Sequence, residues 1–264
     1  MAFSPGRNFG ALAVGNRGGA LTWSFGYFLN TGSLSFDGQS KDQLSAGNGI
    51  DLAIRITDLV QYQDDGRRLT HLGFSWSHGF RDGDREDPNA QLRTRPESFL
   101  TDVRLVDTGN LVNHRRDLIA IEAAWLNGPL SFQGEYFHAF TKSTEHLDFG
   151  GWYLSGSYVL TGETRKYRRA GGVFGEIKPV RSFHLSTGGW GALELALRYS
   201  SVDLNDKSVR GGKERNVTVG LNWYLTRKIR FMANYIYVNV KDRDEPPVSS
   251  GDANIFMARF QVRI

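Results

Sequence analysis

The feature that most constrains the fold is a two-residue alternation of apolar and polar side chains along long segments of the chain. In the segment 19–29, large apolar residues occupy every second position from Leu21 to Leu29, and Thr22, Ser24 and Gly26 lie between them. Successive side chains of a β-strand point to opposite faces, so this pattern predicts strands with one apolar face. Helical periodicity is nearly absent. The predicted strands are 8–16, 19–29, 49–58, 69–79, 116–126, 129–140, 150–161, 190–202, 215–225, 228–240 and 253–264.

The lengths of these strands and of their connections indicate a membrane-spanning sheet. Most of the strands are about 9–13 residues long, which suits a tilted crossing of a bilayer and exceeds the roughly 5–6 residues usual in soluble domains. The connections alternate between short and long, as in outer-membrane barrels with short periplasmic turns and long external loops. The short turns are 16–18, 62–68, 127–129 and 226–227, and the longer segments are 30–48, 80–115, 141–149, 203–214 and 241–252.

Two segments need separate treatment. The segment 162–189 is long at a place where the alternation requires a short periplasmic turn. Residues 97–107 alternate like a strand, but a crossing there would move all later short turns to the outside. We therefore expect 80–115 to be one external loop that folds inward, and 162–189 to be a long periplasmic segment of the same single domain, 1–264.

The tryptophans support a lipid-facing surface. All six lie in predicted strands, and all except Trp190 share the phase expected to point outward. Aromatic side chains at such positions form the interfacial girdles of membrane barrels. The alternative is a soluble sandwich or lipocalin-like barrel with these rings in its core, which would place charged residues such as Arg55, Glu122 and Arg198 outside. The last strand also alternates up to Ile264, like the C-terminal strand that barrel-insertion machinery recognises.

Composition excludes several other classes. The chain contains no cysteine, so neither disulfides nor thiolate chemistry are available. No apolar run approaches the roughly 18 residues that a membrane helix requires. Residues 161–188 hold six basic and two acidic residues, so this segment alone accounts for the formal net charge of +4. Such a local excess favours an anion site over general nucleic-acid binding, and no nucleic acid is expected as a partner.

Several motifs, taken together and in order, resemble the phosphate-selective porin O and P family. They are Phe3–Gly10 (FSPGRNFG), Arg95–Ser98 (RPES), Asp102–Gly109 (DVRLVDTG), Glu122–Pro129 (EAAWLNGP), Gln133–Tyr136 (QGEY), Gly151–Glu163 (GWYLSGSYVLTGE), Phe174–Pro179 (FGEIKP), Gly189–Ser200 (GWGALELALRYS) and Gly220–Leu225 (GLNWYL). The resemblance implies an all-β transmembrane antiparallel barrel of sixteen strands, about eleven of which are present here. It also implies a homotrimer in the bacterial outer membrane, with an anion-selective pore for phosphate or similar anions that is lined by Arg and Lys.

The N-terminus departs from this pattern. Met1 directly precedes a loop-like segment, without the basic and apolar regions of an export signal. An odd number of antiparallel strands also leaves one edge without a partner, which is costly in lipid. We therefore expect the chain to lack the first part of its barrel, and to form an open curved sheet or an imperfectly closed one. An in-frame extension upstream of the Met1 codon would verify this expectation.

The candidate site residues are basic, because fixed positive charge must replace the hydration that an anion loses in a pore. Arg93 and Arg95 have the spacing that places two side chains on one face of an extended segment, and Arg104 follows in the same loop. Salt bridges to the acids of 80–115 are the alternative for these three. The other candidates lie in or near the periplasmic segment, the constriction loop and the strands: Arg165, Lys166, Arg168, Arg169, Lys178, Arg7 and Arg198. For the periplasmic group a solvated turn is the alternative, and for Arg7 a Gly-Arg-Asn turn.

Catalysis and metal binding are poorly supported. His71 and His78 are seven positions apart on one predicted strand and therefore point to opposite faces. His114, His138, His146 and His184 are scattered, so no metal site, no catalytic residue and no cofactor are expected. An outer-membrane barrel hydrolase and a non-conducting fragment or adhesion barrel are the alternative functions.

Four arginines in predicted strands have the phase expected to point into the lumen. They are Arg55, Arg198, Arg230 and Arg259.

Overall fold

The computed structural model describes residues 9–30, 49–81, 91–112, 115–142, 145–186, 188–243 and 248–263. One antiparallel sheet of eleven strands makes up most of this part of the chain. Its strands are β1 (Phe9–Arg17), β2 (Leu21–Asn30), β3 (Gly49–Gln63), β4 (Arg68–Arg81), β7 (Arg115–Asn127), β8 (Leu130–Lys142), β9 (His146–Val159), β12 (Ala192–Asp206), β13 (Val209–Tyr224), β14 (Ile229–Lys241) and β15 (Gly251–Val262). All eleven predicted crossing strands are thus confirmed, and so is the all-β class.

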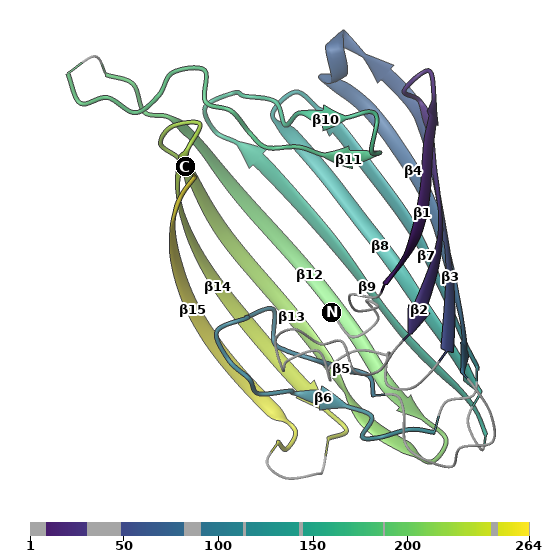
Figure 1. The fold of residues 1–264 in the computed structure, drawn as a ribbon. Coiled ribbons are helices and arrows are strands. Elements are labelled where there is room, and N and C mark those ends of the chain that lie inside the picture. Colours follow the sequence, from purple (N-terminus) through teal and green to yellow (C-terminus); the bar gives the residue numbers. More distant parts are fainter. Residues whose placement is uncertain are drawn as a thin grey trace.

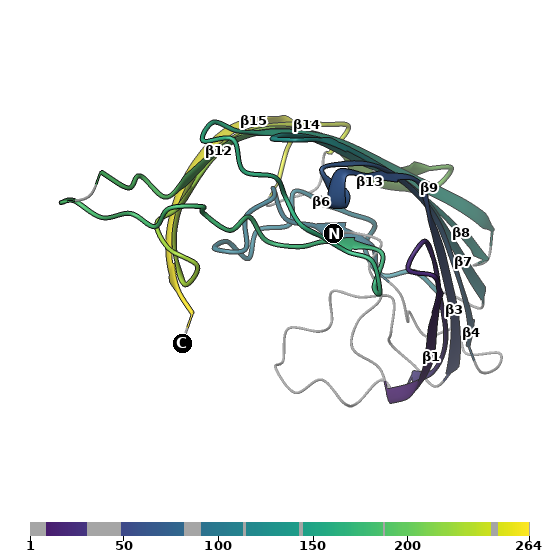
Figure 2. The same cartoon turned by 90° about the horizontal axis from the view of Figure 1, so that it is seen from above.

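The sheet has the simplest topology available to it. Each strand pairs with the strand that precedes it and the strand that follows it in this series, from β1 at one edge to β15 at the other. Figure 1 shows the strands tilted and side by side, and Figure 2 shows them from above as an arc. Within the described residues no hydrogen-bonded pairing joins β1 to β15, so the sheet is open and curved, as expected from the sequence.

The alternation seen in the sequence becomes a difference between the two faces of the sheet. Along β9, Trp152, Leu154 and Tyr158 are exposed, whereas Tyr153 and Val159, which have the opposite phase, are buried. The five tryptophans predicted to point outward share the strand phase of such exposed apolar residues. A soluble core would bury these side chains. The prediction of an outward aromatic face is therefore confirmed.

Two predicted loops are shorter than expected. The strands β12 and β13 continue to Asp206 and from Val209, where the sequence predicted a loop at 203–214. The predicted loop 141–149 likewise shrinks, because β8 extends to Lys142 and β9 starts at His146. The residues there are polar and were therefore assigned to loops. Cross-strand polar contacts stabilise the extended strand pairing there, such as the ion pair of Lys213 with Asp203 at 3.1 Å.

The segment 91–112 and the hairpin β10–β11 (167–174) of the connection between β9 and β12 lie on the concave side of the sheet (Figures 1 and 2). The segment 91–112 holds the small strands β5 (Arg93–Thr94) and β6 (Val106–Asp107), so the segment expected to remain a loop does not cross with the main sheet. The segment 160–191 holds a second small hairpin, β10 (Tyr167–Arg168) and β11 (Val173–Phe174). These two segments position the site.

The only described helical element is the single-turn 3-10 helix Asp64–Gly66 between β3 and β4. In the part of the chain that the structure describes, no helix has the length and apolar character needed to cross a membrane.

Candidate functional site

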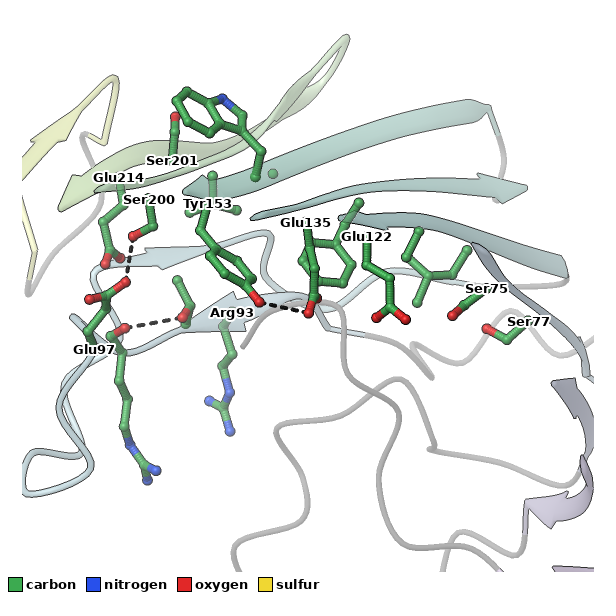
Figure 3. A pocket seen from close by; sticks show the side chains of 18 of the residues that line it. Ser75, Ser77, Arg93, Glu97, Glu122, Glu135, Tyr153, Ser200, Ser201 and Glu214 are labelled. Atoms are coloured by element: carbon green, nitrogen blue, oxygen red, sulfur yellow. Dashed lines mark hydrogen bonds between the residues drawn. The ribbon is translucent and has the colours of Figure 1, made fainter. Parts of the chain in front are cut away.

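The candidate site is a cavity of about 700 Å3 between the concave face of the sheet and the segment 91–112 (Figure 3). The sheet contributes residues from β1, β2, β3, β4, β7, β8, β9, β12 and β13. The charged residues that line the cavity are Arg55, Arg93, Arg95, Arg104, Arg198, Glu97, Glu122, Glu135 and Glu214. The inward loop and the sheet thus form two facing walls, both of which carry charge.

The loop wall supplies three arginines. Arg93, Arg95 and Arg104 all line the cavity, as the spacing of the first two predicts. Arg95 also forms an ion pair with Asp102 at 2.9 Å and lies over the ring of Phe99. Salt bridging, one of the two alternatives weighed from the sequence, is therefore present for Arg95, and pore lining stays a prediction. In Figure 3 the Arg93 guanidinium points away from the sheet wall.

The sheet wall holds its charges in pairs and networks. Arg55 on β3 donates to Glu122 on β7, and the same carboxylate lies 3.1 Å from His71 Nε2 on β4. Tyr153 on β9 donates to Glu135 on β8 at 2.7 Å. Each of these carboxylates accepts a hydrogen bond. The wall can therefore carry acidic side chains in a cavity that is also lined by arginines.

Glu97 connects the two walls. Although it belongs to the loop, its Oε1 accepts hydrogen bonds from Arg198 Nε at 2.8 Å and from Ser200 Oγ at 2.6 Å, both on β12. Its Oε2 accepts a third from Thr218 Oγ1 on β13 at 2.6 Å. Arg198 also stacks on the ring of Tyr153, 3.7 Å from its centroid. Arg198 therefore lines the cavity as predicted, with its charge compensated by Glu97.

A second cavity of about 270 Å3 lies beneath the hairpin β10–β11. Tyr167 of this hairpin contacts His71 on β4, with 2.6 Å between the phenol oxygen and Nδ1. Arg55 donates to the carbonyl oxygen of Gly172 at 3.0 Å. Gly172 has a φ of +60° and lies so close to Thr57 and Thr22 that a Cβ atom would be 2.4 Å from the nearer hydroxyl. The hairpin is thus seated tightly against β2 and β3 of the sheet.

The phenol of Tyr167, which lies outside the membrane-spanning strands, gives a testable pH dependence. Burial, opposed by the charge of Arg55 and reinforced by that of Glu122, raises its pKa from 10.0 to about 12. Between these two values the unfolded chain loses the proton first, so the stability that Tyr167 contributes is present below pH 10 and lost as the pH rises toward 12. We expect the ultraviolet titration of tyrosinate to lose one late-ionising group in Tyr167→Phe. An unchanged titration curve would contradict this assignment.

The periplasmic basic residues do not gather at one site. Arg165 pairs with the buried carboxylate of Glu194 on β12. Arg169 donates to the carbonyl oxygens of Gly18 and Gly19 and stacks on Tyr62 at 4.6 Å. Lys166, Arg168 and Lys178 are exposed. None of these five lines either cavity within the described residues, and their contact with an anion stays a prediction. Arg7 lies outside the described residues.

The sequence prediction for the histidines is confirmed. His71 faces the second cavity, whereas His78 shares the phase of the exposed Phe74 and Phe80 and contacts Asp117 at 2.6 Å. Both ring nitrogens of His71 are occupied, by Tyr167 and by Glu122. Across the described ranges, no group of three or more His, Cys, Asp or Glu side chains has the geometry for a metal ion.

Sequence reasoning did not select the acidic residues of the site. Glu97, Glu122 and Glu135 line the cavity and organise its charges, yet only basic residues were chosen as candidates. The signal available was the inward phase of Glu122 and Glu135, which they share with Arg55 and Arg198. For Glu97 the sequence held no such signal, because the residue lies in a loop whose partners are more than 100 positions away.

Comparison with known proteins identifies the class that this curved sheet and its inward loop define. The model of the family described as phosphate-selective porin O and P matches residues 3–264, so the chain belongs to this family of porins. This membership argues against the alternative of an outer-membrane hydrolase.

The chain is also similar in part to individual proteins. An uncharacterized protein of Caulobacter vibrioides is 33% identical over 204 residues, which are 75% of this chain and 40% of that protein. Porin O of Pseudomonas aeruginosa is 27% identical over 53% of this chain and 34% of its own length. The chain therefore spans less than half the length of these curated relatives. A solved structure, the anion-selective porin from Comamonas acidovorans, aligns with a TM-score of 0.48 and 16% identity over 95% of this chain and 57% of that one.

Proposed function

We propose that the chain forms one wall of a passive, anion-selective path across the bacterial outer membrane. The observation that carries this proposal is the set of three arginines, Arg93, Arg95 and Arg104, that one inward loop presents to the cavity. The charges on the facing wall are partly cancelled, since Glu122 is paired with Arg55 and Glu97 with Arg198. The loop arginines therefore supply fixed positive charge where a hydrated anion must lose water.

We propose inorganic phosphate or other small anions as the solutes. A guanidinium presents a planar fork of N–H donors that matches two phosphate oxygens, and several spaced arginines hold an anion without trapping it. The description of the matching family, phosphate-selective, agrees with this choice. The other partners that we propose are outer-membrane lipid, along the exposed apolar face, and two further copies in a homotrimer of the full-length form.

The test is the zero-current potential of a planar bilayer that separates unequal concentrations of potassium chloride. We expect a potential of the sign that chloride permeation produces, and a chloride current that added phosphate reduces. Cation preference would refute the proposal, and a current insensitive to phosphate would restrict it to other anions.

The outer face should tolerate charge poorly if it contacts lipid. Leu154 on β9 is 54% exposed, and the next residue, Ser155, has the opposite phase. We expect Leu154→Arg to lower the free energy of unfolding in lipid vesicles by about 2–4 kcal/mol, the cost of a basic side chain near the bilayer midplane. The matched control, Ser155→Arg, places the same side chain toward water and should cost much less. Equal urea-unfolding curves for the two variants would contradict a lipid-facing surface.

A further inference from the structure

In the part of the chain that the structure describes, Glu97 is the side chain that links the tip of the inward loop to the main sheet by hydrogen bonds. Within the described residues, the hydrogen bonds that run from residues 95–103 to the main sheet are the three that Glu97 accepts from Arg198, Ser200 and Thr218. The other side-chain hydrogen bonds of the tip are internal to it, such as that of Arg95 with Asp102. The Glu97 side chain is about four-fifths buried, so its charge is also largely removed from water.

The backbone at Glu97 supports a specific role for this residue. Its φ is +50°, in the left-handed region that side chains other than glycine rarely adopt. Such a conformation persists where the surrounding contacts fix it. Here the amide of Glu97 donates to the carbonyl oxygen of Arg95 at 2.8 Å, which closes a tight turn around Pro96 and directs the carboxylate toward β12 and β13.

The base of the loop is held independently of Glu97. Leu92 and Val106 are fully buried in a cluster with Leu204 and Val238 on the sheet. Arg243 also donates to the carbonyl oxygen of Asp107 at 2.8 Å. Loss of the Glu97 contacts should therefore release the tip while the base and the sheet remain folded.

We propose that Glu97 is a positioning residue for selectivity, and that it holds the loop tip against the sheet so that Arg95 lines the passage. This inference rests on the anion path proposed above. The negative charge of Glu97 alone would oppose anion passage. This charge is compensated by Arg198, and the hydrogen bonds of Glu97 fix the loop tip that carries Arg95.

The proposal predicts a smaller change in selectivity than simple electrostatics does. Glu97→Ala removes a negative charge and frees Arg198, which by charge alone would raise the ratio of anion to cation permeability roughly twofold for a unit charge at about 8 Å in water. If the tip is released, Arg95 leaves the passage with it and offsets this gain, so the ratio should stay close to that of the wild type. The conductance should rise because the passage widens.

Glu135→Gln is the matched control. Glu135 lines the same cavity, and it accepts a hydrogen bond from Tyr153 on the sheet rather than from the loop. Neutralising it should therefore raise the permeability ratio without moving the tip. Glu97→Gln retains a carbonyl oxygen that can accept a hydrogen bond from Ser200 or Thr218. Its conductance should therefore lie between that of the wild type and that of Glu97→Ala.

A second measurement reports the position of the tip directly. The chain contains no cysteine, so spin labels at Leu100→Cys on the exposed tip and Arg210→Cys on β13 are unique. Double electron–electron resonance should give a narrow distance distribution for the wild type and for Glu135→Gln, and a broad one for Glu97→Ala. If Glu97→Ala fails to fold, Ser200→Ala combined with Thr218→Val removes two of the three donors and should broaden the distribution in part.

The outcomes separate this inference from the proposed function. A raised permeability ratio or an unchanged distance distribution in Glu97→Ala overturns the positioning role. Cation preference in the wild type defeats the anion path, and with it the selectivity role of Glu97. In that case the distance measurement still decides whether the residue holds the loop.

Discussion

Replacing Arg93 and Arg95 together by glutamate should convert an anion-preferring passage into a cation-preferring one. Each substitution changes the charge at the wall of the cavity by two units, so the pair changes it by four. At a separation of about 8 Å in water each unit is worth roughly 0.5 kcal/mol, which gives a total of roughly 2 kcal/mol, or about 30-fold in relative permeability. The measurement is the sign and size of the zero-current potential in a salt gradient.

Two controls define the cause of that effect. Arg227→Glu makes the same kind of change in an exposed turn between β13 and β14, and should leave the potential nearly unaltered. Lysine at positions 93 and 95 keeps the charge but removes the guanidinium fork, so anion preference should persist while block by phosphate weakens. An unchanged potential in the double glutamate variant would mean that the loop acids, Asp102 first among them, already neutralise these arginines.

Removing the carboxylate of Glu194 should release the periplasmic segment and destabilise the protein by about 3 kcal/mol, as expected when one partner of a buried ion pair is deleted. Glu194 is 1% exposed and accepts hydrogen bonds from Arg165, Asn222 and Tyr224. Glu194→Ala leaves three donors without their acceptor. We expect a lower midpoint of urea unfolding and faster tryptic cleavage within 160–191, where Lys166 and Arg168 are exposed.

An exposed pair in the same region provides the comparison. Arg263 donates to Glu176 and, through these hydrogen bonds first, lowers the pKa of that carboxyl below its usual value. Both side chains are well exposed, so the pair should stabilise the protein little, and only above the pH at which Glu176 is protonated. Glu176→Ala should therefore unfold almost like the wild type. Similar losses in both variants would show that burial of Glu194 is not the cause.

The sheet could be predicted from the sequence because a local rule determines it. Alternation assigns each residue of a strand to one face, and hairpin connections make neighbours of consecutive strands, so strand number and orientation follow without distant information. The ends of strands were predicted less well. Polar residues such as Asp203 and Lys213 looked like a loop, although they continue the ladder by pairing across it.

The site could be predicted only in part, since its geometry depends on long-range contacts. The i, i+2 spacing of Arg93 and Arg95 was a local signal, and both residues line the cavity. The segment 161–188 has few acids of its own, which suggested a free basic cluster. In the structure, Arg165 pairs with Glu194, which lies outside that segment, and Arg169 donates hydrogen bonds to backbone carbonyl oxygens. Partners from distant strands cannot be identified from the composition of one segment.

The contact of the β10–β11 hairpin with the first strands of the sheet has a consequence for the order of folding. Neighbouring strands of the sheet are joined mostly by short connections, so much of the sheet can form by successive local pairing. The contacts of Arg169 with Gly18 and Gly19 join residues about 150 positions apart, and they can form only after the intervening strands have curved. Loop-closure entropy makes such contacts late. The hairpin therefore acts as the closing step of assembly, which fixes the curvature that the strands have already adopted.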